Sequence, residues 1–274
     1  MVNILVPTDL SDLSRIAVQY AIRIANKLNG TVTLLHVILQ PEPTRVAMRE
    51  RLKAFENELV RAAQEDLEAL AAGYERQVRF TEPIRCRVAK GSSFNDTVKK
   101  EARKQHSGLI IMGTRGASGL KKVVLGSNTV SIIAAGTIPV IAVPEQATFK
   151  GFRNIVYATD MRNLEKELSI LVRYIERFGS TIHVLHITSS GKELDALEER
   201  MDQVIHKLGY KNMVSLVLVS RSIESAIEDY VNVSKADLLA MFTHAPTFYE
   251  KIFDRSITRR MAFQAQIPLL AFKQ

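Results

Sequence analysis

The chain has 274 residues, and the feature that most constrains its fold is a sequence pattern that occurs twice. Residues 3–9, NILVPTD, return 151 positions later as residues 154–160, NIVYATD. Residues 31–37, TVTLLHV, return 150 positions later as residues 181–187, TIHVLHI. Segments that recur in the same order indicate one structural unit used twice. We therefore expect two tandem domains of the same fold.

The second copy of the pattern is shorter than the first. IPVIAV at residues 138–143 returns as IPLLAF at residues 267–272, only 129 positions later. The missing residues fall in the second helix and its flanks, so the sheet is preserved. Pro144 and Gly151 interrupt any element that would join the copies. We expect domains at residues 1–147 and 152–274.

Short β-branched segments alternate with segments of helical periodicity in both copies. In the first copy we expect strands at residues 3–7, 31–37, 83–89, 108–113 and 139–143. In the second we expect strands at residues 153–158, 181–187, 213–219, 237–242 and 268–272. Nearly all-apolar strands that alternate with helices predict an α/β fold. Each copy would then be a doubly wound, five-stranded parallel sheet.

Helices are expected between these strands. Apolar residues spaced three or four apart run from Leu13 to Leu28, behind an N-cap at Ser11 or Asp12. Further helices of the first copy are expected over residues 52–70, 97–103 and 129–135.

Composition excludes several classes of protein. The single cysteine, Cys86, cannot form an internal disulfide, and no Cys/His cluster has the spacing of metal ligands. No segment approaches the ~20 apolar residues of a membrane span, so we expect a cytoplasmic protein with no membrane partner. Residues 1–150 carry 21 Lys and Arg against 14 Asp and Glu, which fits an anionic ligand or a solvated basic surface. No nucleic-acid-binding signature is present.

A glycine-rich segment follows the fourth expected strand. Gly113, Gly116 and Gly119 come directly after it, and Gly126 and Ser127 open the next helix. Glycines let backbone N–H groups approach a ligand closely, and a helix N-terminus adds free donors and partial positive charge. The segment therefore predicts a phosphate-binding loop, with Arg115, Lys121 and Lys122 beside it; a tight strand-to-helix turn is the structural alternative.

The position of this loop in the sheet also favours a binding site. It lacks the Gly-Lys-Ser/Thr ending of a Walker A loop, and it does not follow the first strand as a dinucleotide fingerprint does. In open α/β sheets, ligands bind beyond the carboxyl ends of strands where the strand order reverses. If the order is 3-2-1-4-5, Asp9 after strand 1 and Gly113 after strand 4 face each other across that crevice.

Gly113-x2-Gly116-x9-Gly126-Ser127 resembles the Gly-x2-Gly-x9-Gly-Ser/Thr motif of ATP-binding universal stress proteins. Residues 4–9 and 34–37 also resemble that family's first two strands, and the likeness covers the whole chain as a tandem pair. It implies an adenine nucleotide alpha hydrolase-like fold, ATP with Mg²⁺ as ligand, and regulation more than catalysis. The implied binding residues are Pro7, Thr8, Asp9, Val37, Met112, Gly113, Thr114, Arg115, Gly116, Gly119, Gly126, Ser127, Asn128 and Thr129.

The second copy departs from this motif. Aligned from Met241, its glycine positions become Phe242, Ala245 and Arg255, and only Ser256 survives. We expect no ATP binding of the same kind there. The second copy is then a degenerate structural partner or a remodelled pocket lined by Phe242, His244, Phe248 and Tyr249.

Three functions remain open from sequence. The first is an ATP-binding stress-response regulator that acts through an unidentified protein partner. The second is an enzyme, a slow ATPase or nucleotidyl transferase that uses Asp9, although no catalytic dyad or triad is visible. The third is an interaction module that binds no nucleotide. AMP or a cyclic nucleotide would also suit the crevice. The family commonly dimerises through its fifth strand, so the resemblance implies an intramolecular pseudo-dimer across that strand, with a homodimer as a further level of assembly.

Overall fold

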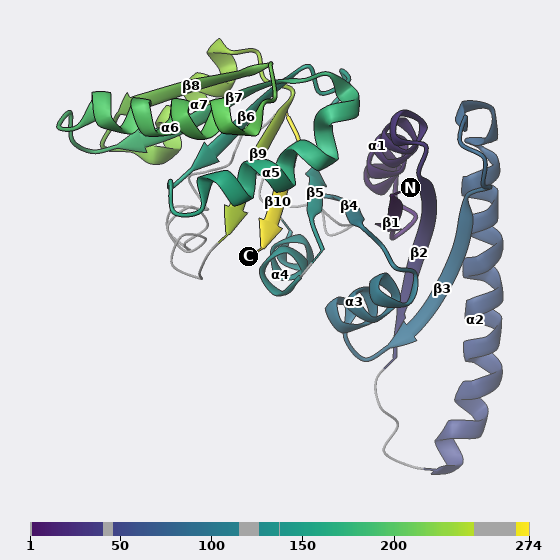
Figure 1. The fold of residues 1–274 in the computed structure, drawn as a ribbon. Helices are drawn as coiled ribbons and strands as arrows, with labels where there is room; N and C mark the ends of the chain where they lie inside the picture. The colour runs from purple at the N-terminus through teal and green to yellow at the C-terminus, as the bar shows by residue number, and fades with distance from the viewer. Residues whose placement is uncertain (1, 41–45, 115–125, 137, 244–266, 274) are drawn as a thin grey trace. The chain divides into compact units, whose positions relative to one another are not determined.

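The computed structural model describes residues 2–40, 46–114, 126–136, 138–243 and 267–273. These residues form two compact units, which divide between Glu145 and Gln146 (Figure 1). The first unit runs from purple to teal in Figure 1, and the second from teal-green to yellow. Each unit contains a set of parallel strands and its own buried core.

The first unit alternates strands and helices throughout. Its elements are β1 (Asn3–Pro7), α1 (Asp12–Leu28), β2 (Thr31–Leu39), α2 (Val46–Ala72), the short 3-10 helix Glu75–Gln77, β3 (Arg85–Gly91), α3 (Phe94–Lys104), β4 (Leu109–Gly113), α4 (Ser127–Ala135) and β5 (Val140–Val143). All strand pairs are parallel, and the spatial order is β3-β2-β1-β4-β5. The strand order therefore reverses between β1 and β4.

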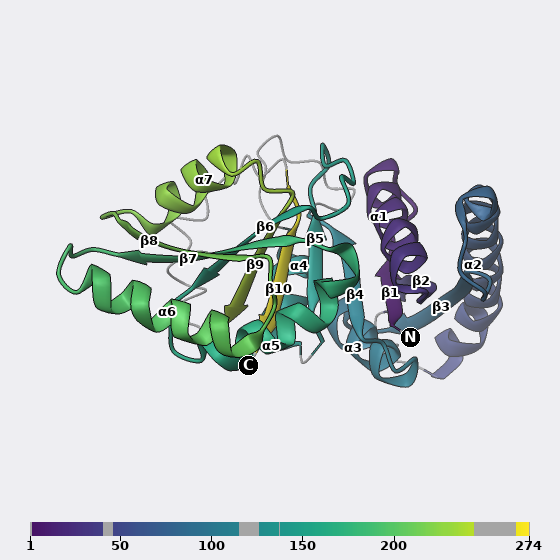
Figure 2. The same ribbon diagram turned by 45° about the horizontal axis from the view of Figure 1, so that its top comes forward.

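Helices cover both faces of this sheet. Right-handed crossovers that step from β1 to β2 to β3 place α1 and α2 on one face. The step back from β3 to β4 and on to β5 places α3 and α4 on the other. Figure 2 shows α1 and α3 on opposite sides of the strands. Both faces of β1 and β4 are buried as a result, which accounts for their all-apolar sequences.

Helix α1 shows why this local sequence is helical. The side chain of Ser11 caps its N-terminus by accepting a hydrogen bond from the Ser14 N–H. The buried side chains follow the three-four spacing of the sequence, including Ala17, Ala21 and Ile24. The helix ends at Asn29, which adopts a left-handed conformation with φ of 51°.

The second unit repeats this architecture. Its elements are β6 (Asn154–Thr159), α5 (Leu164–Ile175), the 3-10 helix Glu176–Phe178, β7 (Thr181–Thr188), α6 (Leu194–Leu208), β8 (Met213–Val219), α7 (Ile223–Val233), β9 (Leu238–Thr243) and β10 (Leu269–Lys273). All strand pairs are again parallel, in the order β8-β7-β6-β9-β10.

The core of the second unit includes a line of aromatic rings. Phe242 of β9 stacks on Phe272 of β10 with ring centroids 4.3 Å apart and planes inclined by 6°. The ring of Tyr157 meets Phe242 edge-on at 5.9 Å, and Tyr174 of α5 meets Phe272 at 5.5 Å. Only 4% of Phe242 is exposed, so this ring belongs to the core.

The predicted fold class and strand order are confirmed in both units. Several element boundaries differ from the prediction by two or more residues; α2, for example, begins at Val46 instead of residue 52. Two of the differences have a clear cause. The third strand spans Arg85–Gly91 instead of residues 83–89, because Pro83 has no N–H to donate to the sheet. The third helix begins at Phe94, three residues before the predicted start, because Ser93 caps it by accepting from the Asp96 N–H.

Among the residues that the structure describes, none of the helices has an apolar stretch of the length that a membrane span requires.

The stability of the second unit is expected to depend on pH through His183. Its Nδ1 lies 2.9 Å from the Tyr230 hydroxyl, and burial lowers the pKa of its imidazole. A base with a lowered pKa in the folded state binds fewer protons there than in the unfolded chain. Its contribution to stability is thus complete above the unfolded pKa and decreases as the pH falls through the folded pKa.

We therefore compare the wild type with His183→Gln at pH 7.5 and about pH 5.5, a range that spans the ordinary histidine pKa of roughly 6.5. When the pH is lowered over this range, the unfolding free energy of the wild type is expected to fall more than that of the variant. The difference cannot exceed about 1.4 kcal/mol per pH unit, the limit for one titrating group, and partial exposure of the ring makes it smaller. Urea denaturation at the two pH values measures it. Equal losses in the two proteins would contradict the prediction.

Candidate functional site

A cavity of about 160 Å³ lies where the strand order of the first unit reverses. It opens beyond the carboxyl ends of β1 and β4, the place where open α/β sheets bind their ligands. Its walls come from the turn after β1, the end of β4 and the first residues of α1, α3 and α4. The lining residues are Pro7, Thr8, Asp9, Ser14, Phe94, Met112, Gly113, Gly126, Ser127, Asn128 and Thr129.

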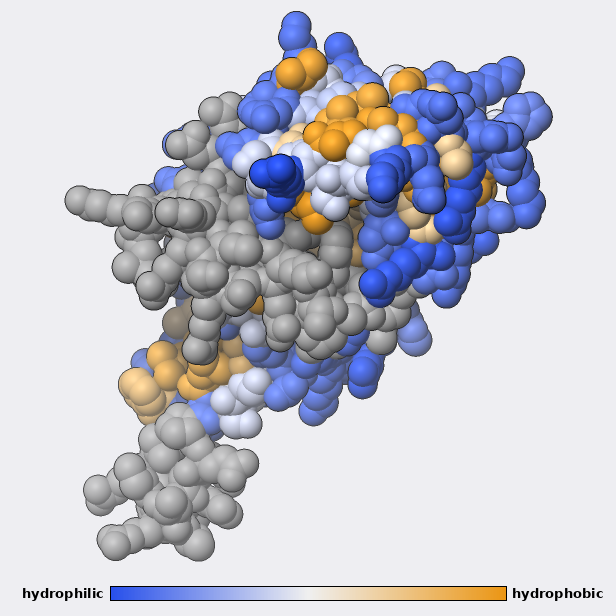
Figure 3. Space-filling view, turned by 90° about the vertical axis from the view of Figure 1, so that its left-hand side faces the viewer, coloured by the Kyte–Doolittle hydropathy of each residue, from blue (hydrophilic) through white to orange (hydrophobic). Residues whose placement is uncertain are grey.

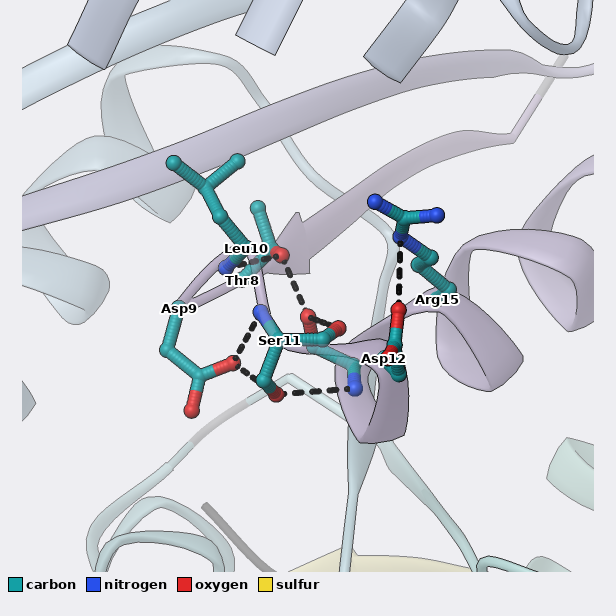
Figure 4. Close-up of polar contacts among 7 residues, drawn as sticks. Thr8, Asp9, Leu10, Ser11, Asp12 and Arg15 are labelled. Atoms are coloured by element: carbon teal, nitrogen blue, oxygen red, sulfur yellow. Dashed lines mark hydrogen bonds and ion pairs between the residues drawn. The ribbon is translucent and has the colours of Figure 1, made fainter. Parts of the chain in front are cut away.

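The turn after β1 is held by its own polar side chains (Figure 4). The Thr8 hydroxyl accepts the Leu10 N–H at 3.0 Å and shares a hydrogen bond with the Ser14 hydroxyl at 2.7 Å. The Asp9 carboxylate accepts the Ser11 N–H at 3.1 Å and the Ser11 hydroxyl at 2.5 Å. These contacts fix the direction of Asp9 before any ligand arrives.

The same turn stores backbone strain. Leu10 has φ of 66°, a left-handed conformation that side chains other than glycine rarely adopt. Such a residue costs on the order of 1–3 kcal/mol and persists where its surroundings determine it. Here the Thr8 hydroxyl holds the Leu10 N–H, and the Thr8 carbonyl accepts a hydrogen bond from His36 Nδ1 at 3.0 Å.

Helix α4 points its N-terminus at the cavity. Its N-cap residue, Gly126, has no side chain that could cap this end, and the first intrahelical bond is donated by the Val130 N–H to the Gly126 carbonyl at 3.0 Å. The N–H groups of the first turn therefore have no intrahelical partner. Thr129 turns its hydroxyl back to the Gly113 carbonyl at 2.9 Å, which ties the helix to the end of β4. Such a terminus attracts anions.

The charged side chains around the turn after β1 point in different directions. Asp12 and Arg15 form an ion pair of 3.4 Å on the helix surface. Figure 4 shows the Asp9 carboxylate on the other side of the turn, pointing away from Arg15. Asp9 is exposed, whereas Thr8 and Ser14 beneath it are buried. The site thus presents one carboxylate and, across it, the positive end of a helix.

The structure gathers most of the predicted binding residues. Nine line the cavity, namely Pro7, Thr8, Asp9, Met112, Gly113, Gly126, Ser127, Asn128 and Thr129. Thr114 is buried just behind them and donates its N–H to the Val143 carbonyl at 3.0 Å. Val37 lies farther along β2, paired with Ala89, and is not among the lining residues. Arg115, Gly116 and Gly119 lie outside the described residues, as do Lys121 and Lys122.

Sequence reasoning missed two lining residues. Ser14 is a small polar residue in the first turn of α1, and its place five residues after Asp9 could have indicated a contact with the turn. Phe94 opens α3 at the end of β3, which reaches the same edge of the sheet. The late predicted start of that helix placed Phe94 in a loop and hid it.

No metal-binding cluster of three or more His, Cys, Asp or Glu residues occurs within the described segments. A divalent cation at this site would accordingly depend on oxygen atoms of the ligand as well as on Asp9.

The second unit keeps the turn and changes the rest. The Thr159 hydroxyl accepts the Met161 N–H at 3.0 Å, and Met161 has φ of 68°, as Leu10 does in the first unit. Its carboxylate, Asp160, forms an ion pair with Arg162 at 3.4 Å. Phe242 stands at the position of Gly113 and turns its ring into the core. Ala245, Arg255 and Ser256, with His244, Phe248 and Tyr249, lie outside the described residues.

A larger cavity of about 590 Å³ lies between α1 and α2 in the first unit. Leu10 and Tyr74 line it, together with the exposed residues Arg15, Asp66 and Gly73. The helix start that it borders, that of α1, is already capped by the Ser11 side chain, and its described walls include no glycine-rich strand end. Its size alone does not make it a phosphate site, so the smaller cavity remains the candidate.

Comparison with known proteins finds relatives of one family. The model of the universal stress protein family matches residues 1–144. Universal stress protein MJ0531 of Methanocaldococcus jannaschii is 31% identical over 141 residues, which cover 52% of this chain and 81% of that relative. Universal stress protein Slr1230 of Synechocystis is 26% identical over an alignment that covers 100% of both chains.

One solved structure extends the likeness to the full length. The crystal structure of a universal stress protein from Archaeoglobus fulgidus matches with a TM-score of 0.67 at 19% identity. The match covers 99% of this chain and 98% of the other. At that identity the likeness concerns the fold.

Proposed function

The chain belongs to the universal stress protein family, and we propose that its first domain binds ATP at the cavity between β1 and β4. The observation that carries this proposal is that Asp9 and the N-terminus of α4, whose N-cap is a glycine, line the same cavity. The Gly-x2-Gly-x9-Gly-Ser spacing, typical of ATP-binding members of the family, supports it from the sequence.

Each side of the cavity suits one part of the nucleotide. The N–H groups at the start of α4 and the hydroxyls of Ser127 and Thr129 are donors for phosphate oxygens. The Asp9 carboxylate, directed by Ser11, is an acceptor for ribose hydroxyls or the adenine edge. Arg115, Gly116 and Gly119 extend the proposed phosphate loop, and Val37 the proposed adenine wall.

The volume of the cavity bears on how ATP would lie. About 160 Å³ is less than the 300–1,000 Å³ typical of pockets that enclose a small ligand. We propose that only part of the nucleotide occupies it. The remainder would extend toward the loop between Thr114 and Gly126, and Mg²⁺ would arrive with the phosphate oxygens.

We propose a regulatory function in which nucleotide occupancy of the domain at residues 1–147 changes contacts with a protein partner. The domain at residues 152–274 would be its structural partner. A cytoplasmic location is part of the proposal and rests on the single cysteine. Phosphate release slower than roughly 1 s⁻¹, the low end of ordinary enzymes, is expected.

We also propose that the two domains form a pseudo-dimer through their fifth strands. Within its own unit β5 pairs with β4 and β10 pairs with β9, and residues 140–143 and 269–272 are all apolar. A cysteine scan of residues 140–143 against residues 269–272 tests this in the full chain. An intramolecular disulfide in at least one pair is expected, and a scan without any contradicts the proposal.

Calorimetric titration of nucleotide-free protein with Mg-ATP tests the proposed binding. We expect one site per chain, because the second domain has replaced the glycines of the motif. An Arg255→Asp chain, altered at the position that aligns with Gly126, is expected to keep that site. Two sites per chain would overturn the single-site proposal, and no heat with no co-purified nucleotide would favour an interaction module.

A further inference from the structure

Strand β8 ends the sheet of the second unit and has no partner on its outer side among the described residues. Its sequence, MVSLVLV over Met213–Val219, has no charged residue. Val214 and Val219 are large apolar side chains that remain 49% and 52% exposed. Figure 3, which views the left-hand side of Figure 1, shows apolar side chains gathered among hydrophilic ones on one face of the molecule. An open, apolar sheet edge is a template for another strand.

The corresponding edge of the first unit is protected. Strand β3 has the sequence RCRVAKG, and Arg85, Arg87 and Lys90 are all exposed. Cationic side chains on an edge strand repel a second strand of the same kind and are a common defence against edge pairing. The chain therefore places cationic side chains on the edge strand β3 of the first unit and no charged side chain on the edge strand β8 of the second.

The backbone of β8 has a defined set of outward groups. The Ile182 N–H bonds to the Asn212 carbonyl at 2.8 Å, and the Ser220 N–H bonds to the Thr188 carbonyl at 2.9 Å. These two bonds show that the even-numbered residues of this segment direct their backbone N–H and C=O groups toward β7, because these groups alternate in direction along a strand. Odd-numbered residues direct their N–H and C=O groups to the open edge. They are Met213, Ser215, Val217 and Val219.

We propose that β8 is the contact surface for a second copy of this chain, with the two β8 strands antiparallel about a two-fold axis at Leu216. In this register every outward residue meets an outward residue, because 213 pairs with 219 and 215 with 217. All the outward N–H and C=O groups are then bonded. A contact of this kind is self-complementary, as a two-fold dimer requires.

Side chains agree with this register. Leu216 and Leu218 lie on the face of the sheet covered by α7, where they pack against Ile227 and its neighbours. Val214 shares that face by the alternation of the strand. The two-fold axis sets Leu216 against its own mate and Val214 against Leu218. These apolar cross-strand pairs are favourable, and no like charges oppose each other within the strand.

Charges on α6 favour a second copy over an unrelated strand. Ser215 donates to Asp202 of α6 at 2.5 Å, so this helix lies on the other face of the sheet beside the edge. Its first nine residues carry four acidic side chains, Asp195, Glu198, Glu199 and Asp202, against the one cation Arg200, whereas its last turn carries His206 and Lys207. A two-fold axis runs the two α6 helices antiparallel and brings each acidic half toward the other's basic end. The same arrangement brings Lys211 near Arg221 of the other copy, and these like charges repel each other. Both residues are exposed, so salt screens the repulsion.

Two cysteine variants test both the surface and the register. In a Cys86→Ser background, Leu216→Cys places each thiol opposite its mate in a non-hydrogen-bonded pair, with Cα atoms about 4.5 Å apart, within the range a disulfide spans. Leu218→Cys, equally half-buried, is the matched control, because four residue positions separate it from its mate by roughly 13 Å. Mild oxidation is expected to link Leu216→Cys chains and to leave Leu218→Cys chains unlinked. Equal linkage of the two, or linkage of neither, overturns the proposal.

Sedimentation measures the assembly without a cross-link. Wild-type protein at micromolar concentration is expected to show twice the 30.7 kDa mass of one chain. Val214→Lys is expected to raise the dissociation constant at least 100-fold, a cost of about 2.7 kcal/mol. Leu59→Lys, which alters an exposed leucine of α2, is the control and should leave the mass unchanged. Val219→Pro removes one outward N–H and no bond to β7, so it repeats the test if Val214→Lys lowers the thermal stability. A monomeric wild type, or a dimer that survives both variants, overturns the proposal.

Discussion

Replacing Gly126 with aspartate is expected to weaken ATP binding at least 100-fold, about 2.7 kcal/mol, without loss of stability. Gly126 is the N-cap of α4 and lines the candidate cavity. Aspartate at an N-cap accepts hydrogen bonds from the second or third N–H of the helix, which are the donors proposed for phosphate. Its negative charge also repels the triphosphate directly.

The same change suits the helix itself. Gly126 has φ of −58° and ψ of 148°, which any L-residue can adopt. Aspartate is among the preferred N-cap residues and complements the helix dipole, so the unfolding free energy should rise by a few tenths of a kcal/mol. Loss of binding together with unchanged or higher stability would separate a site effect from misfolding.

Gly126→Asn is the matched control, because asparagine caps the helix equally well and carries no charge. We expect it to weaken binding by about tenfold, and we expect the gap between the two variants to narrow at high salt. Calorimetric titration and thermal unfolding of the same samples measure both quantities. ATP affinity of Gly126→Asp within a factor of about three of wild type would remove α4 from the site.

Much of the fold could be predicted from sequence because its signals are local and strong. Alternation of apolar strands with three-four periodic helices specifies βα units, and right-handed crossovers leave few ways to connect them. The N-cap at Ser11 was readable from its position before an apolar stripe. The start of α3 was not, because Ser93 follows Gly91 and a second serine and resembles a loop. Either of the two consecutive serines, Ser92 and Ser93, could be the N-cap, so the sequence leaves the start of the helix ambiguous.

The site was predictable where backbone chemistry defines it and less so where tertiary contacts do. Gly113 and Gly126 stand out by their spacing, and Asp9 by its place after β1. Ser14 lines the cavity because its hydroxyl bonds to Thr8, a contact that depends on how α1 packs after the turn. The left-handed conformation of Leu10 carries no signal in its own residue type, since leucine is a poor residue for that region.

The second domain shows what replaces a phosphate loop once the glycines are lost. Phe242 occupies the position of Gly113, and the sequence left it as a possible lining residue of a remodelled pocket. The structure directs the ring into the core instead, between Phe272 and Tyr157. Tyr157 in turn donates its hydroxyl to the buried carboxylate of Glu167, and burial raises the pKa of this tyrosine well above its usual value. The end of β9 thus contributes to stability.

Phe242→Ala is therefore expected to lower the unfolding free energy of the second domain by about 3–5 kcal/mol, the usual cost of truncating a buried phenylalanine. Phe55→Ala is the matched control, because Phe55 is 59% exposed, and its effect should stay below about 1 kcal/mol. Hydrogen exchange of the β9 and β10 amides localises the loss, while β1 and β4 should exchange as before. ATP stoichiometry should remain at one site per chain, because Ala245 and Arg255 still replace the other glycines of the motif. An effect no larger than that of Phe55→Ala would contradict a structural role for this ring, and a second ATP site in Phe242→Ala would show that the ring alone blocks binding there.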